Sequence, residues 1–252
     1  MNVAHRLILA VRFGRRVLMK TSLTFGSLFA GIGGFDLGFE RAGMTCSWQV
    51  EIDDYCRKVL AKHWPNVRRW DDVRTFPPKP VDDWRVDVLC GGFPCQDISN
   101  AGKRAGIDGE RSGLWSEFAR IIRVLRPRFV VVENVAALLG RGIGTVLADL
   151  AKSGFDAEWG VLPACAMGSP HSRERVFCVA YPTGERFDAR REGPQGSERI
   201  ATDGRAYWRS TERGVVRVAY GTPGRVDRVQ ACGNAVVPQV AEWIGRRIVA
   251  SV

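Results

Sequence analysis

Thr-Phe-Gly-Ser-Leu-Phe-Ala-Gly-Ile-Gly-Gly-Phe-Asp, residues 24–36, opens the pattern that decides the fold of this chain. A strand-like run over residues 24–30 leads into several glycines, and a helix-like run follows over residues 35–42. Glycines at a turn from strand to helix let the backbone approach a ligand, and the helix N-terminus offers free amides. Simple tight packing would also explain such a turn, so its meaning depends on the segments that follow.

Strand-like and helix-like runs alternate from Leu23 onward. The strand-like runs are residues 24–30, 46–52, 86–90, 129–133, 158–162 and 176–180. The helix-like runs are residues 35–42, 54–63, 114–125, 144–152 and 239–249. This alternation predicts an α/β fold with helices on both faces of a mostly parallel sheet. Ligands of such sheets bind beyond the carboxyl ends of the strands, where we expect the functional residues.

Carboxylates stand where the second and third strands would end. The second run ends in Val50-Glu51-Ile52-Asp53, and Asp71-Asp72-Val73 follows at the expected tip of a third strand. A carboxylate at the second tip holds ribose hydroxyls in nucleoside-binding sheets, and the third tip could meet an adenine. Together with the glycine-rich turn, these residues predict a nucleoside cofactor.

A thiol follows the next strand. Residues 88–96 read Val-Leu-Cys-Gly-Gly-Phe-Pro-Cys-Gln, so Cys95 lies on a loop directly after an apolar run. A free cysteine is commonly just a small buried hydrophobic residue. At this edge of an open α/β sheet, however, Cys95 is well placed to act as a nucleophile.

An acid and two arginines come from later strands of the same pattern. The run over residues 129–132 leads straight into Glu133, and burial costs a carboxylate heavily unless it is paired or protonated. A purely structural role, capping Asn134 or a nearby helix, is the alternative for Glu133. Alternation along a strand would put Arg173 and Arg175 on one face, although exposed arginines are usually only solvated.

The composition limits the partners. The chain has 252 residues and a formal net charge of +10, which favours a polyanionic partner such as nucleic acid. Its seven cysteines form no CxxC pair and no zinc spacing, so we expect a reduced, cytoplasmic protein without a metal site. No apolar stretch approaches the length of a membrane span.

The motifs, taken in order, closely resemble those of the DNA (cytosine-5)-methyltransferases. They are Phe-Ala-Gly-Ile-Gly-Gly from residue 29, Glu51, Asp72-Val73, Gly-Gly-Phe-Pro-Cys-Gln from residue 91, Glu-Asn-Val from residue 133, Arg-Glu-Arg from residue 173, and Gly-Asn-Ala-Val-Val-Pro from residue 233. The resemblance covers about residues 23–181 and 225–249. The short segment between these ranges, and the ending, look like the bacteriophage and prophage branch.

The resemblance implies a Rossmann-like class I methyltransferase with a small target-recognition lobe. Cys95 would add to carbon 6 of cytosine, and Glu133 would hold the exocyclic amine and ring nitrogen 3 while supplying a proton. Arg175 would face the carbonyl oxygen of the base, and Arg173 would help to position the Cys95 loop. The target cytosine would be flipped out of double-stranded DNA, and the expected biological context is DNA modification with or without a cognate endonuclease.

The methyl donor implied by the resemblance is S-adenosyl-L-methionine, with no metal required. The residues implied for cofactor binding come from the glycine-rich turn, the two strand tips and the last motif: Phe29, Gly31, Gly33, Gly34, Glu51, Ile52, Asp72, Val73, Asn234 and Val236. We expect a monomer that contacts double-stranded DNA and no membrane.

Four segments are expected along the chain. Residues 1–22 would be an N-terminal extension, with Met19 a plausible start, and residues 23–181 the catalytic domain. Residues 182–224 would be a short target-recognition segment, and residues 225–252 would return to the catalytic domain. Arginines in the short segment could contact phosphates and base edges, or could belong to a solvated loop.

Three departures from the family pattern leave alternatives open. His171 stands where the family usually carries Gln, residues 182–224 are short for target recognition, and residues 218–225 replace the usual arginine-containing segment before the last motif. One alternative is methylation of tRNA cytosine. Another is a degenerate prophage remnant that binds DNA or cofactor without turnover. The intact Cys95 and Glu133 favour an enzyme over the remnant.

Overall fold

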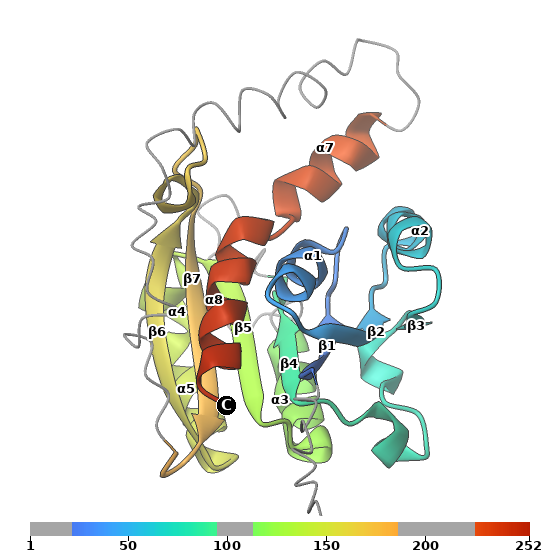
Figure 1. The fold of residues 1–252 in the computed structure, drawn as a ribbon. Coiled ribbons are helices and arrows are strands. Elements are labelled where there is room, and N and C mark those ends of the chain that lie inside the picture. The colour runs from blue at the N-terminus through green and yellow to red at the C-terminus, as the bar shows by residue number, and fades with distance from the viewer. Residues whose placement is uncertain (1–21, 95–112, 186–224) are drawn as a thin grey trace, which may run out of the picture.

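A computed structural model of the chain describes residues 22–94, 113–185 and 225–252, and these form an α/β structure around one sheet (Figure 1). The strands are β1 Thr24–Leu28, β2 Thr45–Val50, β3 Arg68–Trp70, β4 Val88–Gly91, β5 Phe129–Val135, β6 Phe155–Pro163 and β7 Glu174–Pro182. Their order in the seven-stranded sheet is β3-β2-β1-β4-β5-β7-β6. Neighbours from β3 to β5 are parallel, whereas β7 is antiparallel to both β5 and β6.

Helices connect the strands and cover both faces of the sheet (Figure 1). They are α1 Gly34–Arg41, α2 Asp54–His63, α3 Leu114–Leu125, α4 Leu138–Arg141, α5 Ile143–Lys152, α7 Arg225–Asn234 and α8 Pro238–Ala250. Short 3₁₀ turns lie at η1 Val73–Thr75, η2 Val81–Trp84 and η4 Ala164–Met167. No described helix is long and apolar enough to cross a lipid bilayer.

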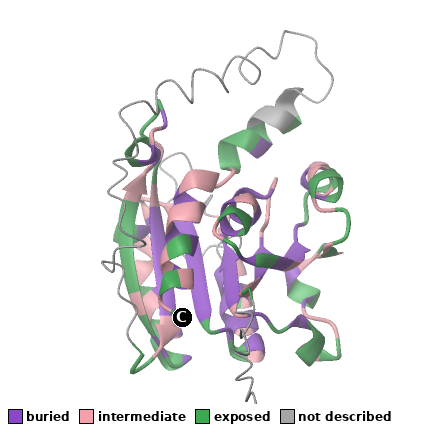
Figure 2. Ribbon diagram, in the orientation of Figure 1, coloured by how far each residue is buried: buried purple, intermediate pink, exposed green. Residues whose placement is uncertain are grey.

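Two hydrophobic cores lie on opposite faces of the sheet, because successive strand residues point to opposite sides. In β5, Phe129 and Val131 join the core under α1 and α8, whereas Val130 and Val132 join the core under α3 and α5. The central strands are therefore buried on both faces, whereas the outer sides of the helices and the edge strand β6 are exposed (Figure 2).

The C-terminal helix α8 packs against α1 on one face of the sheet (Figure 1). Gly38 makes this approach possible, since a Cβ there would lie 2.5 Å from both the Cβ of Ala241 and the carbonyl oxygen of Pro238. Residues at the end of the chain thereby complete the core that begins with the first strand and helix.

The predicted fold class is confirmed, and the elements differ from the prediction in three places. The structure adds α4 and α7, and it supplies β3, of which only the tip was predicted. All three are short or mixed in polarity and so carry weak periodicity. Helices α2 and α3 have the predicted limits. The antiparallel placement of β7 between β5 and β6 depends on pairing across the sheet, which no run of apolar residues reveals.

Candidate active site

A cavity of about 950 Å³ lies beyond the carboxyl ends of β1, β2, β4 and β5, and α7 contributes to its far wall. Ten of the residues predicted as catalytic or cofactor-binding line it: Phe29, Gly31, Glu51, Ile52, Asp72, Val73, Glu133, Arg175, Asn234 and Val236. The topology therefore brings residues from both ends of the chain to one edge of the sheet, as expected for an open α/β fold.

Glu51 anchors the glycine-rich turn. One carboxylate oxygen accepts a hydrogen bond from the Gly31 amide at 2.7 Å, and the other accepts one from the Asp53 amide at 2.8 Å. Burial raises the pKa of Glu51, and these two amides oppose the rise. Gly31 has φ +56°, and a Cβ there would meet no atom within 4 Å, so the turn leaves open space beside the carboxylate.

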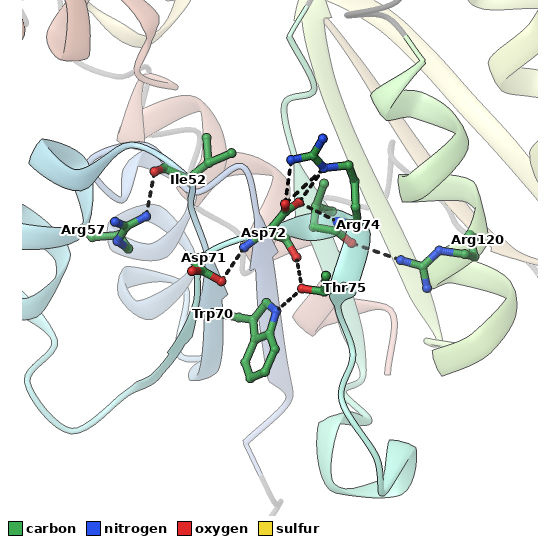
Figure 3. Close-up of polar contacts among 9 residues, drawn as sticks. Ile52, Arg57, Trp70, Asp71, Asp72, Arg74, Thr75 and Arg120 are labelled. Carbon is green, nitrogen blue, oxygen red and sulfur yellow. Dashed lines mark hydrogen bonds and ion pairs between the residues drawn. The ribbon is translucent and has the colours of Figure 1, made fainter.

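The tip of β2 also presents an apolar side chain, Ile52, and the tip of β3 presents a fixed carboxylate, Asp72 (Figure 3). Ile52 is 64% exposed, which is unusual for isoleucine and leaves an apolar surface at the cavity. Asp72 caps η1 by accepting a hydrogen bond from the Arg74 amide at 2.9 Å, and its carboxylate pairs with the Arg74 guanidinium at 2.7 Å. Arg74 lowers the pKa of Asp72, so this carboxylate is ionised at neutral pH.

A second arginine, from α3, holds the backbone of η1 by hydrogen bonds. Arg120 of α3 lies beside this turn (Figure 3). It donates to the carbonyl oxygens of Val73 at 3.0 Å and Phe76 at 2.6 Å, and its Nε donates to Glu117 at 2.6 Å. The turn that carries Asp72 is therefore attached to a helix packed in the core.

Glu133 is the most strongly perturbed acid that lines the cavity. It is 7% exposed, and burial raises its pKa to about 7 even though the charges of Arg175 and Arg173 act in the opposite direction. The Arg175 Nε lies 3.1 Å from the Glu133 carboxylate. In the β5–β7 ladder Arg175 faces Val135, so it is the diagonal neighbour of Glu133 on the same face. An acid with such a pKa can both hold and donate a proton near neutral pH.

The loop that leads toward Cys95 is packed directly on Glu133. A Cβ on Gly92 would lie 2.5 Å from the Glu133 Oε2, and the Asn134 side-chain amide donates to the Phe93 carbonyl at 3.1 Å. These contacts explain the glycine at position 92 and the amide side chain at position 134. Cys95 itself lies outside the described residues, so its distance from Glu133 is not part of this geometry.

Arg173 takes a different position from the one that strand alternation predicted. It precedes β7, has φ +32°, and its Nη2 donates to the Ala235 carbonyl oxygen at 2.7 Å. A positive φ is strained for a residue with a Cβ and is held only by its surroundings. Arg173 does not line the cavity, although its charge still acts on Glu133.

Gly33 and Gly34 serve packing, and neither lines the cavity. Gly33 has φ +89° at the N-terminus of α1, and a Cβ on Gly34 would lie 2.3 Å from the Val236 carbonyl oxygen. The first helix and the last motif are therefore in close contact. This contact brings Asn234 and Val236 to the cavity.

The sequence pattern missed several cavity residues. They include Arg74, Leu114, Asp227, Gln230 and Ala231. Arg74 stands two residues after Asp72, which was a usable signal for an ion pair. Asp227, Gln230 and Ala231 offered no such signal, because the helix α7 that carries them was not predicted. Among the described residues, no three His, Cys, Asp or Glu side chains group as a metal site.

A family model, the C-5 cytosine-specific DNA methylase, matches residues 23–207. Curated relatives include the type II methyltransferase M.NgoFVII of Neisseria gonorrhoeae, 32% identical over 68% of this chain and 47% of its own length. M.HhaI of Haemophilus parahaemolyticus is 33% identical over 64% of this chain and 50% of its own. The chain spans about half the length of the curated relatives it matches.

Solved structures share the architecture. A candidate DNA modification methyltransferase encoded within a prophage (E. coli) is 28% identical, with a TM-score of 0.54 over 64% of this chain and 47% of that chain. A DNMT2 mutant of Spodoptera frugiperda is 21% identical, with a TM-score of 0.56 over 68% of this chain and 54% of that chain. The second likeness concerns the fold alone.

Proposed function

The chain belongs to the family of C-5 cytosine-specific DNA methylases, and on that premise we propose that it methylates carbon 5 of cytosine in double-stranded DNA. The methyl donor would be S-adenosyl-L-methionine, and the cytosine would be flipped out of the duplex. The observation that carries this proposal is the buried Glu133 with its raised pKa, paired with Arg175 at one end of a cavity whose other end carries Glu51, Ile52 and Asp72.

The cofactor would occupy the end of the cavity formed by the glycine-rich turn and the second and third strand tips. Glu51 would accept hydrogen bonds from the ribose hydroxyls, and the exposed Ile52 would cover one face of the adenine. The ionised Asp72 is suited to accept a hydrogen bond from the amino group of adenine. The donor set, two carboxylates and an apolar side chain around open space, fits a nucleoside. When bound, the cofactor supplies a methyl group on a sulfonium.

The chain's own residues would prepare the base for methyl transfer. The Cys95 thiolate would form a bond to carbon 6 while Glu133 gives its proton to ring nitrogen 3, so that carbon 5 becomes nucleophilic. After methyl transfer, solvent water would take the carbon-5 proton, the electron pair of that C–H bond would re-form the 5,6 double bond and expel the Cys95 thiolate, and ring nitrogen 3 would return its proton to Glu133. Arg175 would face the carbonyl oxygen of the base and orient Glu133. Arg173 would also help to order this end of the site.

The net charge of +10 supports a nucleic acid as the second substrate. Residues 182–224 would supply contacts to DNA phosphates and bases, and 186–224 lie outside the described residues. The prophage-like ending of the chain supports a role in modification of phage or prophage DNA. Action on tRNA is the second candidate, because a related branch of the family that methylates tRNA shares the Pro-Cys-Gln and Glu-Asn-Val motifs.

Transfer of labelled methyl groups tests the proposal. We expect labelled S-adenosylmethionine to modify duplex DNA but not tRNA, and Cys95→Ser to abolish transfer, because an alcohol is far less nucleophilic than a partly ionised thiol. Duplex DNA with 5-fluorocytosine should trap a complex that resists denaturant with wild type but not with the Ser variant. If tRNA is labelled and DNA is not, the second candidate is favoured. If Cys95→Ser keeps full activity, the Cys95 thiol is not the nucleophile.

A further inference from the structure

The contact between Arg173 and Ala235 joins the two halves of the candidate site. Arg173 stands at the entry to β7, two residues before Arg175, which pairs with Glu133. Ala235 lies between Asn234 and Val236, which line the cofactor end of the cavity. One guanidinium therefore reaches from the base-facing strand to the wall of the cofactor cavity, with a hydrogen bond of 2.7 Å.

The segment of residues 234–236 is held from a second side by α1. A Cβ on Gly34 would lie 2.3 Å from the Val236 carbonyl oxygen, so backbone meets backbone there. The Ala235 amide donates to the Ala231 carbonyl of α7 at 3.0 Å. Among these described contacts, the side-chain hydrogen bond from Arg173 is the one that comes from the residue directly before β7, the strand that carries Arg175.

The charge of Arg173 also reaches the acid. Arg173 and Arg175 are the two described cations that act on Glu133. Burial lowers the pKa of Arg173, and Arg175 lowers it further. Two partly buried arginines side by side repel each other, and φ +32° adds backbone strain. The surrounding structure must hold Arg173 in this place.

We propose that Arg173 is a positioning residue that links both substrate sites: its guanidinium holds the 234–236 wall of the cofactor cavity from the start of the strand whose Arg175 pairs with Glu133. This inference rests on the proposed function, from which the two substrates are taken. It differs from the role implied by the family resemblance, which was to order the Cys95 loop.

Two separable effects follow from this arrangement. Loss of the hydrogen bond should loosen the 234–236 segment and weaken cofactor binding. Loss of the charge should raise the pKa of Glu133, because one of its two cations is gone. Since the protonated acid is the active form, the alkaline limb of the pH–rate profile should move to higher pH.

Four variants separate these effects. Arg173→Met removes both the hydrogen bond and the charge, and Arg173→Lys keeps the charge. Gly34→Ala displaces the Val236 backbone without changing charge. Arg126→Met is the matched control, because Arg126 also has a positive φ (52°) and donates to a backbone carbonyl, that of Ser153 at 3.1 Å, away from the cavity.

We expect calorimetry to show S-adenosylmethionine binding roughly tenfold weaker in Arg173→Met, the size of a lost hydrogen bond from a charged group. Hydrogen exchange should be faster in the peptide around Ala235. The alkaline limb in single-turnover methylation should shift upward in Arg173→Met, but not in Arg173→Lys or Gly34→Ala. Gly34→Ala should weaken cofactor binding, and Arg126→Met should match wild type in all three measurements.

A folded Arg173→Met with unchanged cofactor affinity and unchanged exchange around Ala235 would overturn the inference. The same pH shift in Gly34→Ala or in Arg173→Lys would also overturn it, since the charge would not be the cause. If Arg173→Met does not fold, cofactor affinity and hydrogen exchange around Ala235 are compared between wild type, Arg173→Lys and Gly34→Ala instead. Failure of the wild-type protein to bind S-adenosylmethionine would instead contradict the proposed function.

Discussion

At the scale of single residues, Gly92 controls the geometry of the acid. The backbone of Gly92 lies so close to Glu133 that the side-chain oxygen fills the place of a Cβ. A buried carboxylate with a pKa of about 7 depends on its two arginine neighbours and on the exclusion of water. One added methyl group beside this carboxylate should therefore change the methyl-transfer rate more than the stability of the fold.

Gly92→Ala should reduce methylation at least tenfold while the protein remains folded. The new methyl group would lie 2.5 Å from Glu133 Oε2, so the carboxylate must leave its position beside Arg175. Overpacking of this kind costs about 1–3 kcal/mol. Methyl-transfer rates and thermal unfolding measured together test this expectation.

Gly160→Ala in β6 is the matched control, because a Cβ there meets no atom within 4 Å. It should keep wild-type activity. Equal activity of the Gly92 and Gly160 variants would mean that Glu133 tolerates displacement, and its proposed role would have to be abandoned.

At the scale of elements, α3 supports the adenine side of the cavity. Its Arg120 donates to two carbonyl oxygens of the η1 turn, whose first residues line the cavity (Figure 3). The Trp70 indole donates to Thr75 at 2.9 Å and holds the same turn from the β3 side. These bonds hold the polar side of a turn whose Val73 is buried in the core.

Arg120→Met should weaken cofactor binding without changing the rate at saturating cofactor. The variant keeps the apolar stem of the side chain and removes hydrogen bonds to two carbonyls, which should lower the free energy of unfolding by about 1–3 kcal/mol. Calorimetric titration with S-adenosylmethionine measures the first effect, and denaturant unfolding measures the second.

The exposed Arg123 on the same helix provides the control. Arg123→Met should leave both quantities unchanged. Normal cofactor affinity in Arg120→Met would show that the turn holds its position without α3.

At the scale of the whole molecule, a buried acid of α1 makes the free energy of unfolding depend on pH. Asp36 is fully buried and accepts hydrogen bonds from Gln49 at 2.9 Å and Cys46 at 3.4 Å, while its Oδ2 has no hydrogen-bond partner among the described residues. Burial raises the pKa of Asp36 to about 6 from an ordinary 3.8. The folded state therefore binds a proton more tightly than the unfolded state does.

The direction of the pH effect follows from linkage. A raised pKa means that the contribution of Asp36 is fully present below about pH 4 and is lost as the pH rises through about 6. Asp36→Asn should remove this loss and so stabilise the protein at pH 8 relative to wild type, by about 1–3 kcal/mol. Denaturant unfolding of both proteins between pH 4 and pH 8 measures the difference.

Asp54→Asn is a control of opposite sign, since Lys58 lowers the pKa of the exposed Asp54. It should not gain stability at pH 8. An Asp36→Asn protein whose stability follows the same pH curve as wild type would show that Asp36 is not the buried proton site.

The sequence alone determined the α/β class, the limits of α2 and α3, and the acids and glycines of the motifs. It could do so because apolar periodicity and strand-tip carboxylates are local features, readable within a few residues. The same reasoning identified Glu133 at the end of a buried strand, since burying a carboxylate costs free energy unless it is paired or protonated.

Only the tertiary structure decided which of these residues meet. The insertion of β7 between β5 and β6 sets Arg175 beside Glu133, and the return of α8 onto α1 brings Ala235 to Arg173 from 62 positions away. The pKa of Glu133 likewise depends on burial and on charges from another strand. Periodicity reports which side of an element is buried, whereas contacts between distant residues follow from the order of strands and the packing of helices.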